Sequence, residues 1–567
     1  TQEDGWRDES PSDVRQLFTN FSYRNEGTTL DLGITLVDSD LNGNGASPVE
    51  LVKADREAVF TYPDNTQNEL RMFTLNGSHW INDSVLLSAN TYYRSNDRST
   101  FNGDGAELEV DSGFLVEEDG DGTDDDDRIL NSNGDEITEA SLGDIDNGVA
   151  LNNTSETEQD SYGFGMQSTF LNDLFDRENQ LIIGLSYDKA DIKYKAQSEV
   201  AGFTPDRGTT GSGQVTANSV VDAQIDSDSL GLYFTDTISV TEQLALTLSG
   251  RYNLTKVDIS GTSENGETQL NETGETHEFH RFNPSVGLTY AVNEELGVYG
   301  SYSEASRAPT PSELTCSNPE KPCALPNSFL SDPPLDQVVS KTWEAGIRGS
   351  FSSVNWTAGL FHSTNEDDII FLPVEEDEDA GRLNSGYFDN VGETQRQGIE
   401  LGANGALFDN KLMWFTNYSY VDATYETSFN TFNANNPSGE NSTVQAGDSI
   451  PGIPEHNFKI GMDYALTQAF SLGFDASYHS EQYYRGDEAN NNDQIDGYTV
   501  VNLHGRLNVT KNVELFAKVD NVFDTDYETF GLYGEADEAP GLDDLEDTRF
   551  VGAGAPRAGW VGIKVSM

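Results

Sequence analysis

The chain has 567 residues, and 98 Asp and Glu against 32 Lys and Arg give it a formal net charge of −66. This charge excludes a nucleic-acid-binding protein, because such proteins neutralise phosphates with Lys and Arg. No apolar run approaches the roughly 18 residues of a membrane-spanning helix, which excludes a helical membrane protein. The 23 Tyr, 29 Phe and 53 Gly are too many for a disordered acidic chain, so we expect a large β protein.

Apolar and polar residues alternate along many segments, beginning near the N-terminus. Clear examples are residues 30–36, 343–351, 458–466 and 501–509. A period of two predicts strands with one apolar and one hydrated face. Charged and small residues share the hydrated face, which is typical of a water-filled lumen rather than a packed core.

The connections between these strands alternate in length. The short ones are 25–27, 82–83, 176–179, 240–243, 292–295, 352–353, 408–410, 467–469 and 510–512. The long, mostly acidic ones are 40–67, 101–159, 201–215, 262–275, 309–337, 373–385, 429–455, 487–497 and 528–556. Strict alternation of this kind predicts an all-β, antiparallel transmembrane barrel with short periplasmic turns and long extracellular loops.

The order of the connections also predicts how the chain enters the barrel. About nineteen strands are expected, and the last one, 560–567, ends on the short-turn side. The first strand then begins outside the cell, whereas a complete barrel begins in the periplasm and has an even number of strands. We therefore expect residues 1–567 to be one N-terminally incomplete barrel domain of the 22-stranded type, with three strands absent.

An acidic run, EEDGDGTDDDDR, occupies residues 117–128 in the second long connection. Asp119, Asp121, Asp124 and Asp126 offer closely spaced oxygen ligands of the kind that Ca²⁺ prefers. The run departs from the EF-hand consensus, and a solvated acidic loop is an equally good interpretation. Structural calcium in an extracellular loop is therefore one hypothesis, and no other cofactor is expected.

The two cysteines, Cys316 and Cys323, lie close together in the fifth long connection. In an oxidising compartment they would close a small disulfide loop, and the alternative is a pair of free thiols. A metal site would need further ligands, and no His is near them in the sequence. We favour the disulfide.

Seven segments resemble the barrel portion of TonB-dependent outer-membrane receptors, in particular the branch that takes up ferric siderophores and ferric citrate. They include DGWRDESPSDVRQLF (4–18), YSEASRAPTPSEL (302–314) and VDNVFDTDYETFG (519–531). The others are residues 40–68, 340–349, 390–402 and 451–458. Each match is weak by itself, but all seven follow the order of the family along a barrel pattern.

The resemblance implies a plug domain and a TonB-binding box in front of the barrel, and neither is in these residues. It further implies active import of an iron chelate across the outer membrane, with the TonB–ExbB–ExbD complex as energy-transducing partner and outer-membrane lipid around the barrel. The final residue, Met567, stands where the family usually has Phe, and we expect barrel insertion to survive this change.

Three arginines are the candidate contacts for an anionic ferric chelate: Arg307 in the SRAP segment, and Arg348 and Arg396 on lumen-side positions. The competing interpretation is that lumenal arginines pair with the abundant acids. For Tyr483 and Tyr484, an aromatic girdle at the outer membrane interface is favoured over an aromatic cage.

No catalytic motif is present, so an enzyme is not expected. The alternative to TonB-dependent import is a passive pore or structural outer-membrane barrel without a plug. The charge of −66 could attract cations to the receptor mouth, or it could reflect adaptation to salty water. We favour adaptation, because the acids are spread over nearly all the long connections.

Overall fold

The computed structural model describes residues 1–566 except 107, 118–127, 267, 271–273, 275, 318–322, 325–334, 374–384, 433–435, 437–440, 535, 537–538 and 543–544. Strands dominate these residues. The helices are short: α1 (Val49–Ala54), α2 (Glu139–Leu142) and α3 (Pro311–Thr315), with two 3-10 turns, η1 (Ala217–Ser219) and η2 (Glu264–Gly266). Among the described helices, none has the length and apolar character needed to cross a membrane.

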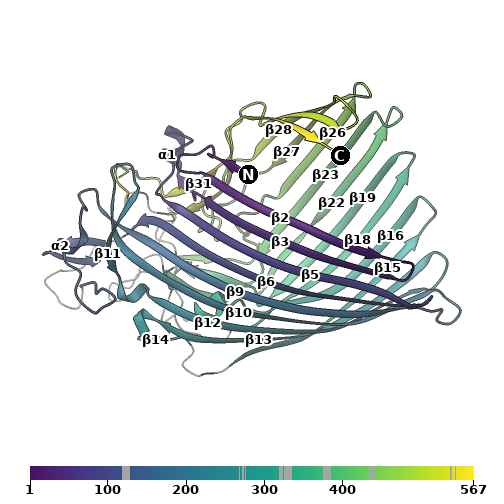
Figure 1. The fold of residues 1–567 in the computed structure, drawn as a ribbon, viewed down its shortest axis with the longest axis horizontal. Helices are drawn as coiled ribbons and strands as arrows, with labels where there is room; N and C mark the ends of the chain where they lie inside the picture. The colour runs from purple at the N-terminus through teal and green to yellow at the C-terminus, as the bar shows by residue number, and fades with distance from the viewer. Residues whose placement is uncertain are drawn as a thin grey trace.

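One large antiparallel sheet curves into a barrel, and each of its main strands pairs with the next main strand along the chain (Figure 1). The first ten are β2 (Ser12–Arg24), β3 (Thr28–Asn42), β5 (Asp64–Asn82), β6 (Val85–Gly105), β9 (Val149–Leu171), β10 (Asn179–Phe203), β12 (Val221–Ser239), β13 (Leu244–Ser263), β15 (His277–Ala291) and β16 (Leu296–Arg307). The remainder are β18 (Val338–Phe351), β19 (Val354–Glu366), β22 (Thr394–Leu407), β23 (Leu412–Tyr425), β26 (His456–Ala465), β27 (Phe470–His479), β28 (Tyr498–Asn508), β29 (Val513–Asp520) and β32 (Ala558–Val565). The described residues thus supply nineteen main strands, which confirms the predicted fold class and strand number.

Shorter strands lie at the long-loop end. β1 (Gln2–Glu3), β11 (Thr209–Val215) and β14 (Thr268–Gln269) extend the large sheet. The small separate sheets contain β4 (Ser47–Pro48), β7 (Leu108–Asp111), β8 (Phe114–Glu117), β17 (Cys323–Ala324), β20 (Ile369–Pro373), β21 (Ser385–Asn390), β24 (Phe429–Phe432), β25 (Asn441–Val444), β30 (Glu528–Tyr533) and β31 (Arg549–Ala553). Most of the long connections therefore contain short strands or helices among their described residues.

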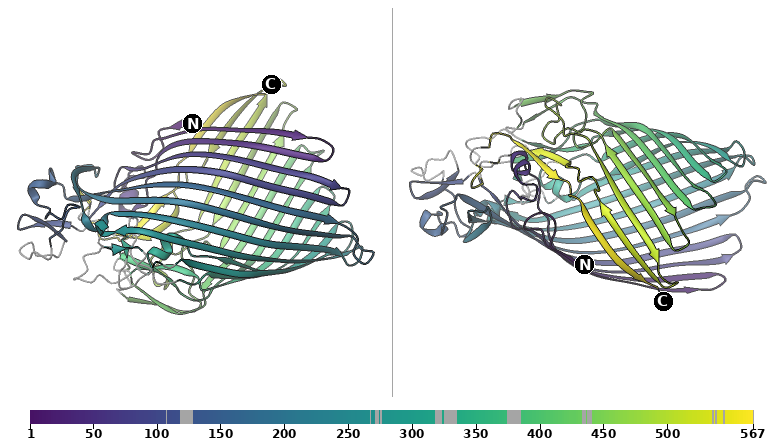
Figure 2. Two further views of the ribbon diagram at one scale, coloured as in Figure 1. Left: turned by 60° about the horizontal axis from the view of Figure 1, so that its bottom comes forward. Right: turned by 90° about the horizontal axis from the view of Figure 1, so that it is seen from above.

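The two ends of the barrel differ as expected. The short connections gather at one end and the long ones at the other, where α1, α2 and the small sheets lie (Figures 1 and 2). β2 runs from the long-loop end toward the first short turn, and β32, which follows the last long connection, runs in the same direction. β2 and β32 are the edges of the large sheet, and within the described residues no main-chain pairing joins them. The expectation of three further strands stays a prediction.

The outer face of the sheet carries large apolar side chains in contact with the surroundings. Leu32 is 40% exposed, Phe73 44%, Tyr93 43%, Trp343 59% and Leu507 40%. These residues alternate with polar ones that point into the lumen, because successive side chains of a strand lie on opposite faces. Exposed apolar side chains in such number indicate a lipid-facing band, as in outer-membrane barrels.

The wall of the barrel is not equally tall all round. β6, β9 and β10 have 21, 23 and 25 residues, whereas β29 and β32 have 8 each. A tilted strand crosses the hydrocarbon layer in about 9–11 residues. The outer halves of β6, β9 and β10 therefore project well beyond the apolar band, on the side of the long loops.

Candidate functional site

The long-loop end of the barrel is covered by loops that pack on one another. The members are loop 1 (residues 43–63), loop 8 (480–497) and loop 9 (521–557), which we call the cap. Val49 and Val52 of α1 form one buried apolar cluster with Tyr484 and Ile495 of loop 8 and with Tyr533 and Val551 of loop 9. β4 of loop 1 also pairs with β31 of loop 9. The first and last loops of the chain thus form one structure.

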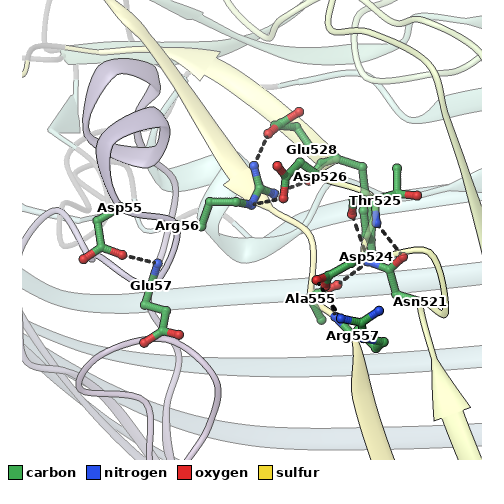
Figure 3. A network of polar contacts seen from close by, with 11 residues as sticks. Asp55, Arg56, Glu57, Asn521, Asp524, Thr525, Asp526, Glu528, Ala555 and Arg557 are labelled. Atoms are coloured by element: carbon green, nitrogen blue, oxygen red, sulfur yellow. Dashed lines mark hydrogen bonds and ion pairs between the residues drawn. The ribbon is translucent and has the colours of Figure 1, made fainter.

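Polar contacts of Arg56 join the two halves of the cap (Figure 3). Arg56 Nη1 donates to Glu528 Oε1 (2.9 Å), and Nη2 donates to the carbonyl oxygen of Tyr527 (2.8 Å). Its Nε lies 3.3 Å from Asp526 Oδ1. In sequence the partners are 472 residues apart, so only the fold brings them together.

A second hydrogen-bond network, also drawn in Figure 3, fixes the base of loop 9. Asn521 is 2% exposed, and its Nδ2 donates to the carbonyl oxygens of Thr525 (2.9 Å) and Ala555 (3.1 Å). The backbone N–H groups of Thr525 and Arg557 donate to Asn521 Oδ1 and Asp524 Oδ1, each at 2.9 Å. Buried amide groups that satisfy both ends of a loop in this way hold it in one conformation.

Two further arginines, which lie outside the cap, form hydrogen bonds to the backbone of loop 1. Arg7 donates to the carbonyl oxygens of Gly45 and Ala58, each at 2.9 Å. Arg207, in the connection after β10, donates to the carbonyl oxygens of Phe60 (2.8 Å) and Val59 (3.0 Å). Guanidinium groups suit this role because they offer several donors in a fixed plane.

Loop 8 folds around a single carboxylate. Asp487 is fully buried and accepts from the backbone N–H groups of Asn491 (2.9 Å) and Asn492 (3.0 Å). The side chain of Asn492 adds a third donor at 3.1 Å. The neighbouring Glu488 accepts from the backbone N–H of Gly486 (3.0 Å), and burial raises the pKa of this carboxyl above its ordinary value.

Tyr484 corrects one prediction from the sequence. It is only 5% exposed and lies in the apolar core of the cap, with its ring centroid 5.6 Å from that of Tyr533. The interpretation of this residue as part of an aromatic girdle was therefore wrong. β27 ends at His479, so residues 482–485 belong to loop 8 rather than to a strand at the membrane interface.

The three predicted chelate contacts do not form one site. Arg307 at the end of β16 pairs with Glu313 of α3 (2.7 Å), and Arg396 on β22 lies 3.6 Å from Asp368. Both are near the long-loop end. Arg348 lies three residues from the end of β18, at the short-turn end, beside Ile347 of the outer face. The competing interpretation, pairing with acids, therefore applies to Arg307 and Arg396. A role of the three in chelate binding stays a prediction.

Sequence reasoning missed other arginines on the lumenal face. Tyr93 of β6 pairs with Tyr162 of β9, and both are on the outer face. Arg94 and Arg98 are one and five residues from Tyr93, so they lie on the opposite, lumenal face of β6. Arg251 on β13 donates to Ser186 Oγ (2.8 Å) and Asn253 Oδ1 (2.6 Å), and its guanidinium lies over the ring of Tyr233 at 5.5 Å. Strand parity, counted from the exposed tyrosines, is the signal that could have found them.

The predicted calcium ligands Asp119, Asp121, Asp124 and Asp126 lie outside the described residues, as does Met567. Among the residues that are described, no group of three or more His, Cys, Asp or Glu is arranged to hold a metal ion. Cys316 is 1% exposed and is disulfide-bonded. The side chain of Cys323 lies outside the described residues, so the pairing of the two stays a prediction.

Comparisons with known proteins agree on one family. A family model described as "TonB dependent receptor-like, beta-barrel" matches residues 5–522. The probable TonB-dependent siderophore receptor PiuA of Acinetobacter baumannii is 24% identical over 313 residues, which cover 54% of this chain and 38% of PiuA. The ferric-pyoverdine BN7/BN8 receptor of Pseudomonas putida is 25% identical over 319 residues, 55% of this chain and 33% of that receptor. The matched region thus spans well under half the length of these relatives.

Solved structures show the same fold. The crystal structure of the siderophore receptor PiuA from Acinetobacter baumannii matches with a TM-score of 0.71 at 14% identity, covering 99% of this chain and 75% of that one. The ferric-catecholate import receptor Fiu from E. coli K12 matches with a TM-score of 0.68 at 15% identity, covering 99% and 75%. The ferric citrate transporter FecA in its unliganded form gives 0.66 at 15% identity, covering 99% and 71%.

Proposed function

This chain belongs to the TonB-dependent receptor-like β-barrel family, and on that premise we propose that it forms the barrel of a receptor that imports a ferric siderophore or a similar iron chelate. The barrel lies in the outer membrane, with its apolar band toward lipid and its long loops outside the cell. The family consists of receptors and transporters, and no catalytic step on the cargo is proposed.

The cap is the observation that carries this proposal. α1, loop 8 and loop 9 share a buried core at the long-loop end, which gives the barrel an ordered extracellular surface. Arg56 and Asn521 fix that cap with hydrogen bonds to partners within it. A preorganised extracellular surface suits capture of a scarce ligand, because little conformational entropy is lost on binding.

The names of the relatives support the choice of cargo. The matched proteins include a probable siderophore receptor, a ferric-pyoverdine receptor and a ferric citrate transporter. The proposed partner for the energised step is the TonB–ExbB–ExbD complex, which acts on members of this family through a plug and a TonB-binding box in front of the barrel. Opening of the plug then gives the chelate a path through the lumen.

Growth on defined iron sources tests the proposal. A strain lacking this receptor and its other iron receptors is complemented with the full-length gene and grown on a panel of ferric siderophores and ferric citrate. We expect growth on at least one chelate, and loss of that growth when tonB is deleted. No rescue with any chelate contradicts the iron cargo, and rescue that persists without TonB indicates a passive pore.

A further inference from the structure

The two faces of the tall wall of the barrel carry charges of different sign. The wall consists of residues 86–100 of β6 and the segments in register with them: 155–169, 182–196, 221–235 and 249–261. Tyr93, Tyr162 and Tyr187 are 37–44% exposed and mark the outer face, so every second residue from them is outer as well. The remaining positions face the lumen.

The outer face of this wall is acidic and the lumenal face is basic. The outer positions hold nine carboxylates and four lysines: Asp97, Glu156, Glu158, Asp160, Asp191, Asp222, Asp226, Asp228 and Asp258, with Lys189, Lys193, Lys195 and Lys256. The lumenal positions hold Arg94, Arg98, Arg251 and a single acid, Asp188. A chain with three acids for each base therefore presents a positive surface to its own lumen at this wall.

The lumenal arginines have no carboxylate partner among the described residues. Asp188, the one acid on their face of the wall, accepts from the hydroxyl of Tyr92 (2.9 Å). Arg94 Nε is buried without a hydrogen-bond partner, and Arg251 donates to neutral oxygens. Arg98, and Arg348 on the lumenal side of β18, form no ion pair within the described part of the chain.

These four arginines lie at successive depths. Arg98 and Arg94 are thirteen and nine residues from the short-turn end of β6, Arg251 is seven from that of β13, and Arg348 is three from that of β18. At about 3.3 Å per residue, the ten residues between the depths of Arg98 and Arg348 correspond to about 33 Å along the strand direction. Gly231 leaves space for the guanidinium group of Arg251, because a Cβ at this position would lie 2.1 Å from Arg251 Nη2.

We propose that Arg98, Arg94, Arg251 and Arg348 form an anion track that attracts a negatively charged iron chelate and guides it from the mouth toward the short-turn end. Guanidinium groups bind carboxylate and other oxyanion ligands through paired, charge-assisted hydrogen bonds. A low-dielectric barrel wall concentrates their field in the lumen, while salt screens the outer carboxylates within about 8 Å. This inference rests on the proposed import function and adds the charge of the cargo.

Uptake of chelates that differ in charge tests the track. The full-length protein is compared with an R94Q/R98Q variant and with R71Q, which removes one charge from the outer face of the neighbouring strand β5. The radiolabelled probes are ferric citrate (anionic), ferrichrome (neutral) and ferrioxamine B (cationic). We expect TonB-dependent uptake of the anionic chelate alone, a fall of about tenfold or more in R94Q/R98Q, and no change in R71Q.

Labelling of arginines in the purified full-length protein provides a second measurement. Phenylglyoxal is expected to modify Arg94 and Arg98, and ferric citrate is expected to protect both, as read by mass spectrometry. Uptake of the neutral or cationic probe at the same rate, or unchanged uptake in R94Q/R98Q, overturns the track. Arginines that never react, with or without probe, would instead be paired with carboxylates of another polypeptide segment. Absence of TonB-dependent uptake of every probe by the wild type is failure of the import function itself.

Discussion

Replacement of Arg56 by Gln tests whether this side chain holds loops 1 and 9 of the cap together. Arg56 makes two hydrogen bonds to loop 9, one of them to the carboxylate of Glu528, and the side chains of Arg56 and Glu528 are 25% and 26% exposed. A hydrogen bond to a charged group contributes about 1.5–3 kcal/mol. The contact to Asp526, whose side chain is 78% exposed, adds less than about 1 kcal/mol because water and salt screen it.

We therefore expect R56Q to lower the free energy of opening of the cap by about 2 kcal/mol and to leave the barrel strands unchanged. Hydrogen exchange followed by mass spectrometry measures this opening directly. Amides of β30 and β31 should exchange about thirtyfold faster in the variant, whereas those of β9 and β10 should not change.

The matched control is R557Q, which breaks an exposed pair with Asp524 at the base of the same loop. The side chains of Arg557 and Asp524 are 53% and 48% exposed, so the pair contributes little. Equal protection of β30 and β31 in R56Q and wild type would refute the view that loops 1 and 9 are held together by Arg56. An equal loss of hydrogen-exchange protection in β30 and β31 of R557Q would show that removal of any charge from loop 9 destabilises the loop.

Three further predictions concern the loops. Y484A should lower the stability of the cap by about 3–5 kcal/mol, because the substitution leaves a cavity where a buried aromatic ring was. Faster proteolysis of loop 8 in the folded receptor would detect this loss, and an unchanged rate of cleavage would contradict the prediction. Burial raises the pKa of Glu488. The contribution of this carboxyl to the stability of loop 8 is therefore fully present below the ordinary pKa of a Glu carboxyl and is lost as pH rises through the raised value. Proteolytic cleavage of loop 8 should increase between about pH 5 and 8 in the wild type and stay constant in E488Q. Maleimide should label neither cysteine without reductant and both Cys316 and Cys323 after reduction, and labelling of unreduced protein would exclude the disulfide.

The sequence carried most of the architecture. Alternation over residues such as 30–36 and 501–509 is a local property, and it correctly predicted strands with an outer apolar face and a polar lumen. All nine short connections lie between consecutive main strands, as predicted. Turn length and side-chain period need no knowledge of distant residues, which is why they could be read directly.

The site was less accessible to sequence reasoning. Arg307, Arg348 and Arg396 were grouped as candidate contacts for the chelate, but the strands place Arg348 at the opposite end of the barrel from the other two. Composition gives the net charge of −66 but not the faces of the barrel on which the acidic residues lie. Nine of the carboxylates lie on the outer face of strands β6–β13, and seven of these nine are outside the long connections to which the acids were mainly assigned.

What the sequence determined by itself was the class of fold, the strand count and the two faces of each strand, because these follow from period and spacing along the chain. Only the tertiary structure decided which loops meet and which charges stay unpaired. Arg56 reaches Glu528 across 472 residues, and Arg94 Nε is buried without a hydrogen-bond partner among the described residues. Both depend on the register and curvature of the large sheet, which set distances between residues that no local pattern relates.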